Sequence, residues 1–187
     1  EFNGYWKDVG TLESYWEANM ELIDIVPEFN LYEEYWKIYT KSEILPPQYL
    51  SSGSVVERVI VGEGSSIYGK VFNSVIGCGV TIGEGTVIRD SIIMNRTEIG
   101  PGCEINKAII AENVRIGADV RLGIGEEEEN DTASHIYNKG LVTVGEKSVI
   151  PHGVTVGKNV VISGITTEID YENTYLASGK SLIKAGE

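Results

Sequence analysis

The strongest pattern in the sequence is the spacing of its large aliphatic residues between positions 61 and 122. A helix would place apolar residues three and four positions apart, and a half-buried strand would place one at every second position. Neither period fits, because these residues step by six, six and five positions, which gives a repeat of 17 residues. The repeated aliphatics are Ile76, Ile82, Ile88, Ile93, Ile99, Ile105, Ile110, Ile116 and Leu122. The segment is therefore predicted to be an internal repeat whose units are stable only when stacked.

Two positions before most of these aliphatics stands a small or β-branched residue, and a glycine often follows directly. This hexapeptide repeat predicts short strands joined by sharp corners, since glycine accepts a positive φ at no steric cost. Three strands would form one coil, and stacking would place Ile88 over Ile105 and Ile93 over Ile110. Each buried aliphatic is worth about 1.5–3 kcal/mol. A β-sandwich with frequent glycines is the alternative, but a sandwich does not require three successive trios in one register.

The residues before the repeat have a different pattern. Residues 12–26 have apolar residues at helical spacing, with Thr11 as a fitting N-cap and Pro27 as the stop. Residues 27–52 are predicted to be an extended linker that carries several large apolar side chains, of which the aromatic ones pack on a neighbouring surface. These side chains are Tyr32, Tyr35, Trp36, Ile38 and Tyr39. The predicted division of the chain is residues 1–26, the linker 27–52, and a repeat domain over residues 53–187.

The repeat is expected to be irregular in three places. In the first coil the aliphatic after Ile67 comes early, at Val71 or Phe72. An acidic loop interrupts the register at residues 123–141. Its four consecutive glutamates, 126–129, could bind a cation, but such runs more often form a solvated, mobile face. The repeat then resumes for at least one more coil. The tail, with Tyr171, Tyr175, Leu176, Leu182 and Ile183, is expected to cap the open end, whose strand edges would otherwise invite pairing.

Composition narrows the function classes. At 187 residues and 42% hydrophobic, the chain can bury a core. Its formal charge of −13 argues against binding to nucleic acid, which requires a basic surface. There is no long apolar run and no signal peptide, so we expect no membrane span and a cytoplasmic protein. Cys103 falls in a small-residue core position and Cys78 at a corner, which predicts two reduced thiols.

Few residues indicate chemistry directly. Hexapeptide-repeat acyltransferases use a histidine as general base, so His135 in the loop and His152 at a corner are candidates, although each lacks an identifiable partner in the sequence. Asp8 stands beside glycine, after an aromatic segment and before a helix N-terminus. This is a place where α/β enzymes present groups to a phosphate and its Mg²⁺. Asp8 could equally be a turn residue that supports the Thr11 cap.

Several motifs together resemble the ADP-glucose pyrophosphorylases, also called glucose-1-phosphate adenylyltransferases. The resemblance rests on Tyr-Trp-Lys-Asp-Val-Gly-Thr at positions 5–11, the helix sequence at 12–20, the linker motifs at 36–39 and 45–47, and repeats that contain Asp-Ser-Ile-Ile-Met at 90–94. It implies an all-β fold class, a left-handed parallel β-helix preceded by one helix and an extended linker. Residues 1–26 would then be the C-terminal strand and helix of a nucleotidyltransferase catalytic domain.

The resemblance also implies a function. The full protein would transfer the adenylyl group of ATP to glucose 1-phosphate in glycogen or starch synthesis, with Mg²⁺ as cofactor and Asp8 as one metal ligand. The catalytic and nucleotide-binding residues would lie outside this chain, so the fragment alone is expected to be inactive. The β-helix would serve a homo- or heterotetramer and an effector site, for which the basic candidates are Arg115, Arg121, Lys158, Lys180 and Lys184.

Two other interpretations remain open. The chain could be a non-catalytic regulatory subunit of the same complex, although a subunit without chemistry has no reason to keep Asp8. It could also be a hexapeptide-repeat acyltransferase, in which replacement of His135 or His152 by alanine would abolish activity.

Overall fold

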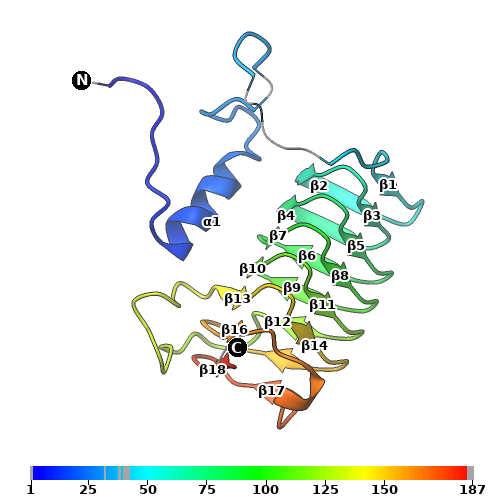
Figure 1. The fold of residues 1–187 in the computed structure, drawn as a ribbon, viewed down its shortest axis with the longest axis vertical. Coiled ribbons are helices and arrows are strands. Elements are labelled where there is room, and N and C mark those ends of the chain that lie inside the picture. Colours follow the sequence, from blue (N-terminus) through cyan, green and yellow to red (C-terminus); the bar gives the residue numbers. More distant parts are fainter. Residues whose placement is uncertain (1, 32, 38, 40–42, 185–187) are drawn as a thin grey trace.

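In its described residues the protein is a three-sided stack of short parallel strands with one α-helix beside it and a single turn of 3-10 helix, Glu168–Asp170, near the last coil (Figure 1). The computed structural model describes residues 2–31, 33–37, 39 and 43–184. Tyr32 and Ile38 of the predicted linker lie outside the described residues. Among the described residues, no helix has the length and apolar character needed to cross a membrane.

The strands form three sides, which we call A, B and C, and every neighbouring pair is parallel. Side A consists of β1 (Tyr49–Leu50), β3 (Ser66–Ile67), β5 (Thr81–Ile82), β8 (Glu98–Ile99), β11 (Arg115–Ile116) and β14 (Val149–Ile150). Side B contains the start of β4 (Lys70–Ile76), then β6 (Val87–Arg89), β9 (Glu104–Asn106), β12 (Arg121–Leu122), β15 (Thr155–Val156) and β17 (Tyr175–Leu176). Side C contains β2 (Val55–Val61), the end of β4, β7 (Ile92–Ile93), β10 (Ala108–Ile110), β13 (Val142–Val144), β16 (Val161–Ser163) and β18 (Ser181–Ile183).

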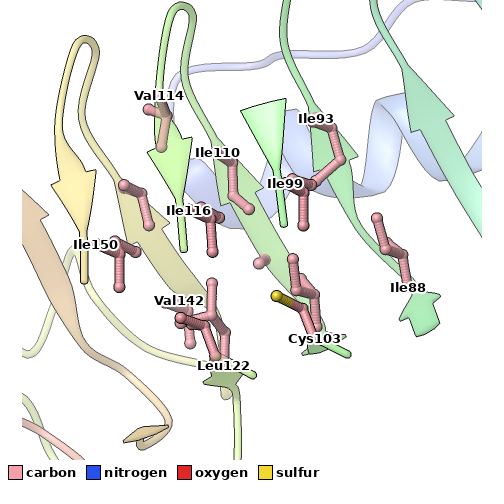
Figure 2. Packing of buried hydrophobic residues seen from close by; sticks show 14 of the residues in the cluster. Ile88, Ile93, Ile99, Cys103, Ile110, Val114, Ile116, Leu122, Val142 and Ile150 are labelled. Atoms are coloured by element: carbon pink, nitrogen blue, oxygen red, sulfur yellow. The ribbon is translucent and has the colours of Figure 1, made fainter. Parts of the chain in front are cut away.

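The core is the stack of repeated aliphatics inside these sides (Figure 2). Ile88 pairs in register with Ile105, and Ile93 with Ile110, so both predicted ladders are confirmed. The small residues two positions earlier are buried beside them. Most of the polar ones bond to the neighbouring coil: the Thr86 hydroxyl donates to the Gly100 carbonyl at 2.7 Å and accepts from the Cys103 N–H at 3.0 Å. The buried Ser148 hydroxyl, by contrast, has no partner among the described residues. The core therefore leaves few polar groups unpaired.

The corners explain the glycines and the unequal steps of the repeat. A Cβ on Gly83 would lie 2.6 Å from the Gly100 carbonyl carbon of the next coil, so stacking excludes a side chain there. The five-residue step turns from side B to side C through a single residue with positive φ, and Asn73, Asp90 and Lys107 occupy this position in successive coils. Asparagine and aspartate tolerate this conformation better than most residues.

The first coil has the predicted irregularity. Val71 is fully buried and follows the buried Ile67 after only four positions, whereas Phe72 is partly exposed. The early aliphatic is therefore Val71. Coil formation also begins before residue 53, because β1 pairs with β3 through Tyr49 and Leu50.

The helix is shorter than its apolar pattern predicts. The helix α1 (Leu12–Glu21) ends with Leu22 as C-cap, five residues before the predicted end at Val26. Two β-branched residues, Ile25 and Val26, precede Pro27, and both the branching and the proline disfavour helix. Both side chains are exposed.

One side of α1 packs on the outer surface of side C. Leu12, Tyr15, Trp16 and Met20 contact a cluster formed by the residues Ile92, Ile109 and Leu141. The Trp16 indole N–H donates to the Asp90 carbonyl at 2.7 Å, and the Lys107 ammonium lies 5.1 Å from the ring centre. The predicted packing of the linker aromatics is not found within the described chain, because Tyr35, Trp36 and Tyr39 are exposed.

The acidic loop leaves the prism between β12 and β13, as predicted. The side chains of residues 126–129 are exposed, but residues 126–131 are bonded to the last two coils through backbone groups and through the Asn130 side chain. We call these six residues the strap. The Ser178 hydroxyl donates to the Glu126 carbonyl at 2.6 Å, and the Asn130 amide donates to the Asn159 carbonyl at 2.9 Å. The loop is thus attached to the prism as well as emerging from it.

The tail continues the prism. Leu176 pairs with Val156 on side B, and Leu182 pairs with Ile162 on side C, so these two residues form the next rungs of the ladders. Tyr171 also packs against the core. Burial raises the pKa of Tyr171 to about 12, so its hydroxyl stays protonated at neutral pH. The predicted cap is therefore a further, two-sided coil.

Candidate functional site

The segment before α1 holds the one predicted metal ligand, Asp8. Its side chain is exposed, and Oδ1 accepts a hydrogen bond from the Gly10 N–H at 3.0 Å. The carboxylate therefore supports the turn that leads into the helix, which is the structural role considered for it in the sequence. This bond engages one carboxylate oxygen and leaves the residue facing solvent.

The start of α1 is fixed by the predicted cap. The Thr11 hydroxyl accepts from the Ser14 N–H at 3.1 Å, and the Ser14 hydroxyl accepts from the Thr11 N–H at 3.1 Å. These reciprocal bonds satisfy two of the donors that a helix N-terminus leaves free. Thr11 is confirmed as the N-cap, and the position of Asp8 relative to the helix start is correspondingly well defined.

A group of polar contacts between residues 5–8 and α1 was not predicted from the sequence. The Lys7 ammonium contacts the Glu17 carboxylate at 3.2 Å and also the Glu21 carboxylate. The Tyr5 hydroxyl donates to Glu21 Oε2 at 2.9 Å. Hydrogen bonds from Lys7 and Tyr5 hold the pKa of Glu21 below its usual value, so this carboxylate is ionised at neutral pH. Regular alternation along residues 5–8 was the only signal that could have indicated which of them face the helix.

One residue of this site, Asp8, is suited to bind Mg²⁺. The metal prefers oxygen donors, keeps several waters and is commonly bound through one or two carboxylates. Asp8 offers such a carboxylate in an exposed position. Across the part of the chain that the structure describes, no three acidic, histidine or cysteine side chains gather as a metal cluster. This includes the described glutamates of the acidic loop, so Asp8 could contribute to a metal site but could not form one with these residues alone.

The two histidines do not form a site together. His135 is exposed in the acidic loop. His152 lies at a corner beside a groove of about 800 Å³ along side A, where Glu98 and Arg115 also line the wall. Its Nδ1 atom is 3.8 Å from Asp119 Oδ2, and both side chains are about two thirds exposed. This distance is too long for a hydrogen bond, so the carboxylate does not orient the imidazole as a general base requires.

The partner of His152 could be found from the sequence only through the repeat. Asp119 is 33 residues earlier, and the acidic loop lies between the two. A repeat extended across the interruption would place both residues at the same corner.

Both cysteines are free thiols, as predicted. Cys103 is buried in the small-residue position, where its sulfur lies 3.1 Å from the Gly117 carbonyl oxygen. Burial raises the pKa of this thiol, so it is protonated and unreactive at neutral pH. Cys78 is partly exposed at a corner.

The basic residues considered for an effector site do not converge. Four of them are in ion pairs: Arg115 with Glu98, Arg121 with Glu104, Lys180 with Asp131 and Lys184 with Asp170. Arg115 lies on side A and Arg121 on side B, while the two lysines lie near the last coil. No single anion could contact all four. Lys158 lies beside Gly140 at the base of the acidic loop.

Comparison with protein families supports the fold. A family model described as the EIF2B subunit epsilon LbH domain, where LbH denotes a left-handed β-helix, matches residues 37–126. Together with the parallel coils, this match confirms the predicted fold class: an all-β, left-handed parallel β-helix with one preceding helix.

Comparison with curated proteins extends the similarity to the whole chain. Proteins named glucose-1-phosphate adenylyltransferase match all 187 residues, with 64% identity in Lachnospira eligens and 48% in Acetivibrio thermocellus. The protein of the same name from Thermotoga maritima is 51% identical over 183 residues, or 97% of the chain. The chain spans 44% of the length of the first two relatives and 43% of the third.

Proposed function

The chain is homologous over its full length to glucose-1-phosphate adenylyltransferases, and from this premise we propose that the complete protein has that activity. It would transfer the adenylyl group of ATP to glucose 1-phosphate, forming ADP-glucose and pyrophosphate for glycogen synthesis. The present chain would supply the β-helix, for oligomerisation and regulation, together with the segment that carries Asp8. The nucleotide site would lie in the part of the relatives that this chain does not match.

One observation carries the proposal: the similarity includes both the segment before α1 and the β-helix. Left-handed β-helices occur with many activities, so the fold alone would not identify a function. The match over all 187 residues also includes residues 5–11, which make no contribution to the prism. Similarity in both parts favours an adenylyltransferase over an unrelated protein with a hexapeptide-repeat domain.

In this proposal Asp8 is one ligand of Mg²⁺. The bound metal would neutralise negative charge on the reacting phosphates. The chain's own contribution is to hold the Asp8 carboxylate just before the capped start of α1, where the Gly10 N–H orients one of its oxygens. A second ligand would come from outside the chain, since the described residues provide no cluster of three potential ligands.

The proposal is tested with the complete protein by measuring pyrophosphate release with Mg²⁺ over a grid of nucleoside triphosphates and sugar 1-phosphates. Activity confined to ATP with glucose 1-phosphate is expected. Activity with another pair would assign a different nucleotidyltransferase. No activity from a folded protein, restored only by a second subunit, would instead assign the chain to a regulatory subunit.

The role of Asp8 is tested by Asp8→Asn in the same protein. The substitution keeps the shape of the side chain but removes its charge, so kcat should fall at least about tenfold, equivalent to about 1.4 kcal/mol of barrier. The oligomeric state, measured by light scattering, should not change because Asp8 is exposed. Unchanged turnover would remove Asp8 from the metal site.

A further inference from the structure

Along residues 5–8, successive side chains point in opposite directions. Tyr5 and Lys7 face α1 and are half-buried, whereas Trp6 is 76% exposed and Asp8 is exposed. Successive side chains of an extended segment point to opposite faces, so the contacts of Tyr5 and Lys7 determine where Asp8 points.

The segment runs antiparallel to the helix that holds it. Tyr5 bonds to Glu21 at the end of α1, Lys7 bonds to Glu17 and Glu21, and Thr11 bonds to Ser14 in the first turn. Only 22% of the Lys7 side chain is exposed, against 46% and 43% for its two partners. The lysine therefore lies between the segment and the helix, where its ammonium is shared by carboxylates one helical turn apart.

The helix in turn is attached to the β-helix. The Trp16 indole bonds to the Asp90 carbonyl, and apolar residues of α1 pack on side C. Asp8 therefore stands between two fixed points, the Lys7 contacts before it and the capped helix start after it. Loss of the Lys7 contacts would leave the carboxylate attached at one side only.

We propose that Lys7, held by Glu17 and Glu21, is a positioning residue that fixes residues 5–8 on α1 and so directs the Asp8 carboxylate away from the helix toward the metal. This inference rests on the proposed function of Asp8. Lys7 itself does not contact substrate or metal in this arrangement, and its contribution to stability is small because its two partners are nearly half exposed and ion pairs at the surface contribute little.

The test uses the complete protein with Lys7→Met, which keeps most of the aliphatic stem and removes the ammonium. Binding of Mn²⁺, followed by electron paramagnetic resonance, should weaken several-fold, and the Mg²⁺ concentration for half-maximal activity should rise by a similar factor. Glu21→Gln, which removes one of the two carboxylate charges, should shift both quantities in the same direction. Lys7→Arg keeps a cation with several donors, so both the Mn²⁺ affinity and the Mg²⁺ concentration for half-maximal activity should stay near the values of the unmodified protein.

The matched control is Lys139→Met. Lys139 pairs with Glu13 of the same helix at 3.4 Å but belongs to the acidic loop, far along the chain from Asp8. Lys139→Met should leave the Mn²⁺ affinity and the Mg²⁺ dependence of activity unchanged. The melting temperature of each variant establishes that it is folded. If Lys7→Met does not fold, Glu21→Gln provides the test of the inference.

Two outcomes would overturn the inference. If Mn²⁺ affinity is unchanged in Lys7→Met and Glu21→Gln but lost in Asp8→Asn, Asp8 acts on the metal without help from Lys7, and the proposed function survives. If Asp8→Asn also binds Mn²⁺ normally, the metal role of Asp8 fails and the positioning role fails with it.

Discussion

Sides A and C of the prism have similar interiors and different outer surfaces. On side C the outward residues of successive coils are mainly apolar, with Ile92, Ile109 and Val161 all at least 97% buried. The upper part of this surface lies under α1, and the strap bonds to the last coils near its lower part. On side A the outward residues Thr81 and Glu98 are exposed, and the groove remains open.

This difference shows that inward and outward residues of the repeat have separate roles. The inward residues recur with the 17-residue period and determine the prism, whichever side they occupy. The outward residues are free of that constraint, so their polarity determines which side receives the helix and the loop. The covered side thereby connects the β-helix to the segment that carries Asp8.

The largest loss of stability is expected for a substitution of an inward residue on side A. It tests whether the inward residues of this open side support the prism as those of the covered side do. Ile99→Asp would place an unpaired charge in the ladder of side A, where Ile99 is 2% exposed. It should destabilise the protein by about 4 kcal/mol or more and unfold the prism. Thr81→Asp, on the outer surface of the same side, should change stability by only about 0.5 kcal/mol. A native melting transition in Ile99→Asp would show that the assigned register is wrong.

A smaller effect compares the outer surfaces directly. Ile109→Ala removes a side chain that is 3% exposed beneath α1 and should cost about 2–4 kcal/mol, measured by urea unfolding. The matched change on side A is Val149→Ala, which should cost less than about 1 kcal/mol because Val149 is only partly buried. Equal losses would mean that side C is not covered as the structure shows.

The smallest effect concerns the corner that leads from side C back to side A. Its residues have positive φ in successive coils, and most are glycine, arginine, asparagine or lysine, but the last is Ile165 at φ 55°. A β-branched residue is strained in this conformation, by about 1 kcal/mol. Because the side chain is 52% exposed, Ile165→Asn should raise the melting temperature by about 2–4 °C. A lower melting temperature would show that Ile165 makes a favourable contact that outweighs the strain.

The prism was predictable because its main signal is periodic. The ladders depend on residue spacing alone, and Val144 follows Ile110 by 34 positions, which is twice the repeat. The acidic loop thus adds the length of one repeat without forming a coil, and only its charge and turn-forming residues indicated this. The early end of α1 was missed because the apolar spacing continues past Glu21 although the β-branched residues do not favour helix.

The candidate site was predictable only in part. Thr11 was identified as the cap because capping is local, and Asp8 was selected from its position before the helix together with the family resemblance. The contacts of Lys7 with Glu17 and Glu21 were missed because they span ten and fourteen residues and follow no motif. The role of Asp8 as a metal ligand and the requirement for Mg²⁺ remain predictions.

The strap has a consequence for the order in which the chain folds. Solenoids ordinarily grow by contacts between neighbouring repeats. Asn130, however, bonds to Ser181, which is 51 residues later. At a synthesis rate of about 5–20 residues per second, the strap would wait about 3–10 s for this partner. During that interval the strap would lack its bond to Ser181, so residues 126–131 would stay accessible to proteases for longer than a segment that pairs only with the neighbouring coil.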